Sequence, residues 1–219
     1  MLTYKEITKS EAIRTYIIRA DESLAALGFT EHSFAHVMHA AEMAGYILET
    51  MGYDERTVEL AKIAGYLHDI GNLVNRSEHS QSGAVMAWSI LNDMGCDPAE
   101  LATIVTAIGN HDEGTGVPVN AVAAAMILAD KADVRRSRVR NRDLSTFDIH
   151  DRVNYSVIKS ALQINEDKTQ VTLQLTVDTQ FGSVMDYFEI FMQRMLLCRK
   201  AAEKLGLRFK LVINGQQLI

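Results

Sequence analysis

The segment AKIAGYLHDIGN, residues 61–72, decides the fold of this chain and the place of its chemistry. Apolar side chains recur along it at the spacing of one helix face, and His68 and Asp69 follow at the end of that face, just before Gly71. A buried imidazole beside a buried carboxylate is costly unless the two groups are paired or bind a cation. The segment therefore predicts an apolar helix that ends in an ion-paired or metal-binding His-Asp pair.

Helical patterns surround this segment on both sides. Asp54, Asp97 and Asn120 each stand where an N-cap is expected, and Pro98 follows Asp97 at a favoured first-turn position. The glycines predicted to end helices in the left-handed conformation are Gly28, Gly52, Gly71, Gly95, Gly109 and Gly206. The helices predicted before residue 142 lie at 9–27, 32–51, 55–70, 78–94, 98–108 and 121–140.

The pattern changes after Ser145, where Val, Ile, Leu and Thr become frequent. Residues 155–164 and 170–177 are predicted to form a hairpin, and residues 209–213 a third strand. A last helix is predicted at 184–205, and its Met and Phe stripe is typical of core packing. We expect a mainly α fold with a single domain over residues 1–219: a helical bundle with its core at 30–140, and a small C-terminal antiparallel β-sheet packed with a final helix at 145–219.

Composition narrows the class of protein. With 219 residues, 47% of them hydrophobic and 23% charged, the chain has the values of a globular domain rather than a disordered one. The net charge of -6 argues against nucleic acid as the main partner. The longest apolar run, Ala121 to Ala129, is too short to span a membrane, and no secretory signal layout opens the chain. Cys96 and Cys198 are expected to be free thiols of a cytoplasmic protein, for which a homo-oligomer stays open.

The His-Asp pair in its context resembles the HD-domain metal-dependent phosphohydrolases, helical proteins named for an adjacent His and Asp. The resemblance covers roughly residues 30–140. It rests on HVMHAAEMA at 36–44, LHDIGN at 67–72, EHSQSGAVMAWSIL at 78–91, AIGNHDEG at 107–114 and ILADKAD at 127–133. It implies a metal site built from His36, His68, Asp69, His79, His111 and Asp130.

Six ligands are more than one ion needs, since a single catalytic zinc commonly takes three protein ligands and a water. The resemblance to the two-metal members implies that Asp69 bridges two ions, the first held by His36, His68 and Asp130 and the second by His79 and His111. Mixed imidazole and carboxylate ligation without thiolate suits two divalent or mixed-valence ions. Iron or manganese is the first expectation, and zinc, cobalt and nickel stay open.

Three further histidines leave alternatives. His32 and His39 lie four and three residues from His36, so either could share its helix face. The apolar pattern favours His36 as the ligand and leaves His32 and His39 as substrate-facing, supporting or exposed residues. His150, in the polar stretch FDIHDR, is expected at the surface.

The sequence departs from the family at the substrate end. Many members read HDxGK, but Asn72 stands in place of that lysine, so a positive phosphate contact is missing unless Arg76 replaces it; a solvated Arg76 is the alternative. If the predicted helix continues past Asp130, one stripe of it carries Lys131, Arg135, Arg138 and Arg142. Lys131 and Arg135 would then contact an anionic substrate, although such a run is commonly a solvated face. The candidate substrate-binding residues are thus Lys131, Arg135, Arg76 and Asn72.

The resemblance implies a metal-dependent phosphohydrolase. We expect it to hydrolyse a phosphoester of a small phosphorylated metabolite, a nucleotide being the first candidate, by a metal-activated bridging hydroxide. Asp69, as the bridge, and Asp112, as a proton donor to the leaving oxygen, are the expected catalytic residues, with a simple helix cap as the alternative role of Asp112. Two rival functions stay open: a di-iron oxygenase of a small polyol or phosphonate, and a non-catalytic module that senses a nucleotide.

Overall fold

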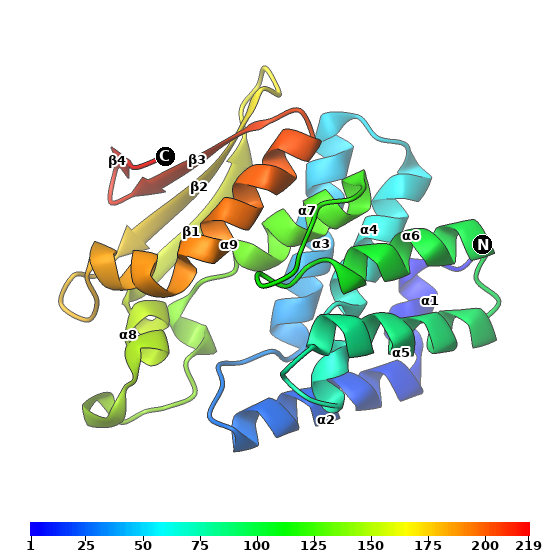
Figure 1. The fold of residues 1–219 in the computed structure, drawn as a ribbon, viewed down its shortest axis with the longest axis horizontal. Helices are drawn as coiled ribbons and strands as arrows, with labels where there is room; N and C mark the ends of the chain where they lie inside the picture. Colours follow the sequence, from blue (N-terminus) through cyan, green and yellow to red (C-terminus); the bar gives the residue numbers. More distant parts are fainter.

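The computed structural model describes all residues from 1 to 219, and Figure 1 shows a helical bundle beside a small sheet. The bundle elements are α1 (Tyr4–Lys9), α2 (Glu11–Ala26), α3 (Phe34–Met51), α4 (Glu55–Leu67), the 3-10 turn η1 (Ile70–Leu73), α5 (His79–Asp93), α6 (Pro98–Gly109) and α7 (Ala121–Lys131). Helix α7 packs against α3, α4, α6 and α9. It is buried from Val122 to Lys131, as its almost uninterrupted apolar sequence requires.

The C-terminal part contains the short 3-10 turns η2 (Arg136–Arg138) and η3 (Leu144–Thr146), helix α8 (Ile149–Ser156), strands β1 (Val157–Ile164) and β2 (Gln170–Val177), helix α9 (Val184–Lys204), and strands β3 (Arg208–Ile213) and β4 (Gln216–Gln217). The strands lie in the order β1-β2-β3-β4. Helix α9 joins β2 to β3 and lies along the sheet on the side of α7 (Figure 1).

The fold is mainly α with a small C-terminal sheet, as the sequence predicts, but the sheet is mixed rather than antiparallel. β1 and β2 pair antiparallel across a tight turn, and β3 and β4 do the same. β2 and β3 pair parallel, with Leu173 opposite Leu211. The 21 residues of α9 return the chain along the sheet, so that β3 enters in the direction of β2.

The predicted helix at 121–140 is wrong beyond Lys131. Ala132 caps α7, and the amide of Asp133 donates to the Asp130 carbonyl in a tight turn. Arg138 is buried and ties the following segment down by donating to the carbonyl oxygens of Asp133 and Glu31. The predicted stripe of Lys131, Arg135, Arg138 and Arg142 on one helix therefore does not exist. The predicted helix at 9–27 is likewise divided, because Ser10 ends α1 and caps α2.

Gly28, Gly52, Gly95 and Gly206 have positive φ and end helices as predicted, but Gly71 and Gly109 do not. Gly109 is the last residue of α6. Gly71 is needed for another reason, because a Cβ built there would overlap the carbonyl oxygen of His79 and the amide nitrogen of Gly83. The close approach of η1 to α5 thus depends on the glycine at position 71.

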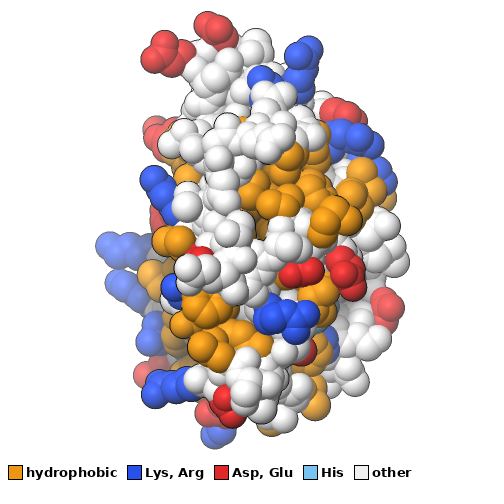
Figure 2. Space-filling model, turned by 90° about the vertical axis from the view of Figure 1, so that its left-hand side faces the viewer, with side chains coloured by type: hydrophobic (Ala, Val, Ile, Leu, Met, Phe, Trp, Pro, Cys, Tyr) orange, Lys and Arg blue, Asp and Glu red, His pale blue; other side chains and the backbone are white.

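The bundle and the sheet share one hydrophobic cluster of 53 buried residues that extends from Leu2 to Ile213. Figure 2 shows the face that lies to the left in Figure 1, on which Lys and Arg side chains are interspersed with acidic ones and with apolar patches. None of the helices combines the length and the hydropathy that crossing a membrane would require.

Candidate metal centre

The predicted ligands lie at helix ends that meet in the bundle. His36 is in the first turn of α3, the pair His68 and Asp69 follows α4, His79 begins α5, His111 follows α6, and Asp130 is in the last turn of α7. All of these side chains are buried, with exposed fractions from 0% to 7%. Residues separated by as many as 94 positions therefore share one polar cluster inside an apolar bundle.

One group of donor atoms consists of three side chains and one oxygen of Asp69. Nε2 of His36 lies 3.3 Å from Nε2 of His68. The same His36 nitrogen lies 3.3 Å from Oδ1 of Asp130 and 3.5 Å from Oδ2 of Asp69. Nε2 of His68 lies 3.3 Å from that Asp69 oxygen and 3.6 Å from Oδ1 of Asp130. The four atoms enclose a space in which a single ion could contact all of them.

A second group uses the other oxygen of Asp69. Nε2 of His79 lies 3.1 Å from Nε2 of His111. Oδ1 of Asp69 lies 3.5 Å from the His79 nitrogen and 4.0 Å from the His111 nitrogen. The two carboxylate oxygens of Asp69 thus face different groups, which is the arrangement that a bridging carboxylate requires.

Each of the four imidazoles faces the cluster with Nε2 and is held in place by a hydrogen bond from Nδ1. Nδ1 of His68 donates to the Gly65 carbonyl (2.7 Å), Nδ1 of His79 to the Arg76 carbonyl (3.1 Å), and Nδ1 of His111 to the Ile108 carbonyl (2.6 Å). Nδ1 of His36 donates to Oδ2 of Asp133 at 2.8 Å. These hydrogen bonds direct all four Nε2 atoms toward the cluster, as in metal-ligating histidines, which bind in the neutral form.

Neighbouring charges and burial shift the pKa values of His68 and His111 in opposite directions. Burial disfavours the charged form of His68, but the attraction of Asp69 and Asp130 outweighs it and raises its pKa to about 10. Burial, together with the positive charges near it, lowers the pKa of His111 to about 3. A cation that bound at His68 would therefore replace a proton there, because an imidazole must be neutral to act as a ligand.

The donor set fits a metal ion. Ligand atoms of His36, His68 and Asp130 lie within 4.8 Å of one another, and so do those of His68, Asp69 and His111. Nitrogen and carboxylate donors packed this closely need a positive charge among them, which a metal ion would supply in place of the proton on His68. Imidazole and carboxylate without thiolate suit first-row transition metals.

Asp133 supports the cluster from behind, and the sequence analysis did not identify it. Besides the bond from His36, its carboxylate accepts from Nε of Arg135 at 2.7 Å. Arg135 also donates to Oγ of Ser137 and lies 3.6 Å from a carboxylate oxygen of Glu31. Arg135 therefore holds Asp133 in place instead of following Asp130 by one helical turn. The ADKAD pattern, with an acid three residues after Asp130, was the available signal.

A buried ion-pair chain connects Asp130 to the C-terminal helix. Nζ of Lys131 lies 2.7 Å from Oδ2 of Asp130 and 3.3 Å from Oε1 of Glu113. That Glu113 oxygen also accepts from Nε of Arg194, on α9, at 2.9 Å. Lys131 is 4% exposed, so its charge is used inside the protein. Sequence reasoning missed Glu113 and Arg194, and the position of Arg194, 64 residues beyond Asp130, gave no signal.

Asn72 and Arg76 form a second chain of contacts to the cluster. Nδ2 of Asn72 donates to Oδ1 of Asp69 at 3.0 Å and to its carbonyl at 2.9 Å. Nη1 of Arg76 donates to Oδ1 of Asn72 at 3.3 Å. Asn72 therefore orients the carboxylate that faces both donor groups. Asp112 is half-buried, lies close enough to His79 to favour its charged form, and is not among the residues that line the adjacent cavity.

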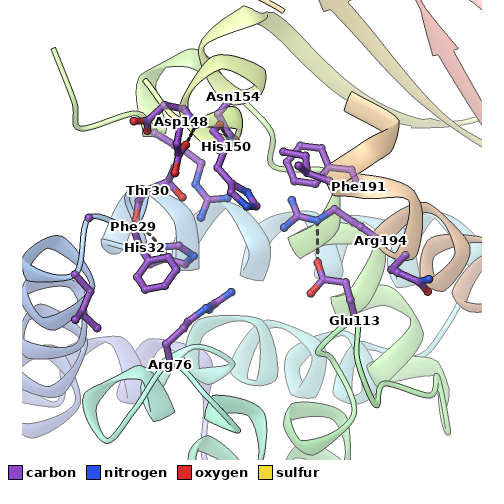
Figure 3. A pocket seen from close by; sticks show the side chains of 16 residues that line it. Phe29, Thr30, His32, Arg76, Glu113, Asp148, His150, Asn154, Phe191 and Arg194 are labelled. Atoms are coloured by element: carbon purple, nitrogen blue, oxygen red, sulfur yellow. Dashed lines mark hydrogen bonds and ion pairs between the residues drawn. The ribbon is translucent and has the colours of Figure 1, made fainter. Parts of the chain in front are cut away.

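A cavity of about 530 Å³, shown in Figure 3, is lined by residues that connect to the cluster, Arg76 through Asn72 and Glu113 through Lys131. Arg76, Glu113 and Arg194 line it, as do Phe29 and Phe191. Two histidines that the sequence left open also line it: His32 and the exposed His150. Nδ1 of His32 donates to the Thr30 carbonyl at 2.7 Å, and its ring centroid lies 5.5 Å from that of His36. His39 is exposed elsewhere.

The chain is similar to several known proteins. It is 24% identical to the uncharacterized protein MJ1020 of Methanocaldococcus jannaschii, over 64% of this chain and 62% of that one. It is 30% identical to ribonuclease Y of Campylobacter concisus, over 54% of this chain and 21% of the enzyme. The chain thus covers less than two thirds of the length of these curated relatives.

Among solved structures, a predicted HD superfamily hydrolase from an uncultured Thermotogales bacterium matches 57% of this chain and 67% of its own, with 24% identity and a TM-score of 0.45. The model of the HD domain matches residues 33–152, more than half of the sequence. That stretch contains every donor of the two groups around Asp69. This chain is therefore a member of the HD-domain family.

Proposed function

We propose that this protein is a metal-dependent phosphohydrolase that cleaves a phosphoester bond of a small phosphorylated molecule, a nucleotide being the first candidate. The observation that carries the proposal is the pair of donor groups that face the two oxygens of Asp69, beside a cavity lined by arginines. Membership of the HD family supports a hydrolase that uses divalent metal ions.

We assign His36, His68 and Asp130 to one ion, His79 and His111 to the other, and Asp69 to both. Bound divalent ions supply Lewis acidity and an activated water for attack on phosphorus. The donor set leads us to propose iron or manganese first, with zinc, cobalt and nickel as alternatives.

The other polar residues have distinct tasks in this proposal. Asn72 keeps Asp69 turned toward both donor groups, and Asp133 accepts from Nδ1 of His36, so that Nε2 is the nitrogen that faces the cluster. Arg76 and Arg194 bring guanidinium groups to the cavity and neutralise charge on a phosphoryl group. Lys131 balances Asp130 from inside the protein and leaves substrate contacts to the arginines.

Metal analysis of protein purified without oxygen, followed by a phosphate-release screen over nucleotides and other phosphomonoesters, tests the proposal. We expect about two metal ions per chain and phosphate release that Asp69→Asn abolishes. Asp178→Asn serves as the matched control, because this carboxylate pairs with Arg136 and belongs neither to the donor groups nor to the cavity lining. Oxygen consumption with no phosphate release would contradict the proposal in favour of an oxygenase. Nucleotide binding without turnover would favour a sensing module.

A further inference from the structure

We propose that the cavity binds its ligand in one orientation, with a single phosphate at Arg76 and Arg194 and a hydrogen-bond-donating, uncharged or cationic end at the acceptors of α8. This inference deepens the proposed function and rests on it for the identity of the ligand as a phosphomonoester. Its basis is the placement of Arg76 and Arg194 in one part of the lining and of the α8 acceptors in another. Arg138 and Glu113 also line the cavity, but Arg138 donates through Nε and Nη1 to backbone carbonyls and Glu113 is paired with Lys131 and Arg194.

The end of the cavity next to the metal centre is rich in donors. Arg194 uses Nε to bind Glu113, and Arg76 uses Nη1 to bind Asn72. The remaining N–H groups of both guanidiniums have no protein acceptor, and the two side chains approach the cavity from different elements (Figure 3). Two guanidiniums with free donors in one small cavity favour a phosphate between them.

Both arginines are also connected to the proposed metal ligands. Arg76 reaches Asp69 through Asn72. Arg194 reaches Asp130 through Glu113 and Lys131. A phosphate held by the two guanidiniums therefore lies at the end of the cavity where the proposed chemistry takes place.

The other end of the cavity is formed by α8, which packs on η2, α9 and β1. Asp151 and Asn154 lie on this helix, Asp148 caps it, and all three residues line the cavity. Oδ1 of Asp148 accepts from the Asp151 amide, and Oδ2 of Asp151 accepts from Asn141. The second oxygen of each carboxylate has no protein donor.

Asn154 provides the independent observation that this end receives a ligand. The residue is only 6% exposed, and its Nδ2 donates to the His150 carbonyl at 2.9 Å. Its Oδ1 has no donor from the protein, although the residue lines the cavity. The oxygen keeps access to the cavity, so a hydroxyl or amine of a ligand can donate to it in place of water.

The negative charge at the α8 end of the cavity also selects among ligands by the charge of their distal group. Asp148 and Asp151 would repel a second anionic group on the distal part of a ligand, whereas a hydroxyl, an amide or an ammonium group would be attracted. The cavity is also lined by Phe29, Ile190 and Phe191, and the guanidiniums of Arg76 and Arg194 lie over the two phenylalanine rings, so an apolar or aromatic portion of the ligand could pack there.

Three probes with the same phosphate test the inference: AMP, its N6-aminoethyl derivative with a cationic end, and its N6-carboxymethyl derivative with an anionic end. Calorimetry gives the Kd of each for the metal-loaded protein, and phosphate release is measured separately. We expect the anionic probe to bind at least about tenfold more weakly than the other two. Asp151→Asn should reduce this difference, whereas Asp143→Asn, on a neighbouring exposed loop, should leave it unchanged.

Arg194→Gln should weaken all three probes by a similar factor, with the exposed Arg199→Gln on the same helix as its control. Equal affinity for the three probes, tighter binding of the anionic one, or no binding of any would overturn the orientation. The expected order of affinity without phosphate release would retain the orientation and reject the proposed hydrolase. Arg76→Gln repeats the phosphate arm if Arg194→Gln does not fold.

Discussion

Replacing Asp133 by Asn tests whether a residue that need not touch a metal ion sets the affinity of one. Oδ2 of Asp133 accepts from Nδ1 of His36 at 2.8 Å, while Oδ1 accepts from Nε of Arg135 at 2.7 Å. An asparagine has one oxygen, so its NH2 group must face either the imidazole N–H or the guanidinium N–H. Both His36 and Asp133 are at least 98% buried, and water cannot repair the mismatch.

The loss of such an outer partner commonly costs roughly 10- to 100-fold in metal affinity, which is about 1.4 to 2.8 kcal/mol. We expect Asp133→Asn to lose this much at the group that contains His36. The affinity of the group that contains His79 and His111 should change little, because none of its recorded contacts involves Asp133. Competition with a chromophoric chelator, titrated against metal-free protein, resolves two successive affinities.

Asp178→Asn is the control, since that carboxylate pairs with Arg136 and is not part of the cluster. The reasoning fails if Asp133→Asn keeps both affinities within about twofold of the starting protein, or if the two affinities fall by the same factor. The second result would indicate general loosening of the fold rather than the release of one imidazole.

Three further predictions concern stability and reactivity. Gly71→Ala should lower the free energy of unfolding by about 1 to 3 kcal/mol, because its Cβ would overlap the backbone of α5, whereas Gly109→Ala should be tolerated; urea denaturation compares the two. Burial opposes the charge of Glu113, but attraction to Lys131 outweighs it and holds the pKa of Glu113 below 4.5. This stabilisation is complete above that pH and is lost as the pH falls through the lowered pKa, so Glu113→Gln should flatten the acid side of a Tm-against-pH profile. Burial raises the pKa of Cys198 to about 12, so iodoacetamide should label this thiol only after unfolding, as mass spectrometry would show.

The sequence predicts most helices because their signals are local. Asp97 caps α6 with Pro98 in its first turn, and Gly52 ends α3 with φ of 84°, both as the residue types indicate. The end of α7 is different, since the residues after Lys131 are compatible with a helix. The chain leaves the helix there because the buried Arg138 donates hydrogen bonds to the carbonyl oxygens of Asp133 and Glu31. No local sequence pattern indicates these contacts.

Strand direction shows a similar limit. The alternation of residues in β2 and β3 indicates strands without indicating how they pair. The predicted antiparallel hairpin of β1 and β2 is confirmed, but the prediction that the whole sheet is antiparallel was wrong. The length of α9 between them is itself evidence for a parallel crossover, which the composition of the strands could not supply.

In the candidate site, the sequence identified the six residues that the structure brings together, because a recognisable order of motifs carries them. The residues it missed act through tertiary contacts. Glu113 stands next to Asp112 in HDEG, yet only the fold shows that it, and not Asp112, joins Lys131 to Arg194. Asp112 as a proton donor stays a prediction.

Three of the four imidazoles, those of His68, His79 and His111, are fastened to a carbonyl oxygen three residues earlier in the chain. Each ring is thus aimed by its own helix end rather than by a distant neighbour. Ring orientations fixed this locally do not need an ion to maintain them, and little conformational entropy is left to lose when one arrives. Extraction and reloading of the metal should consequently be a reversible exchange within an intact bundle, with the helical circular dichroism spectrum constant throughout the cycle.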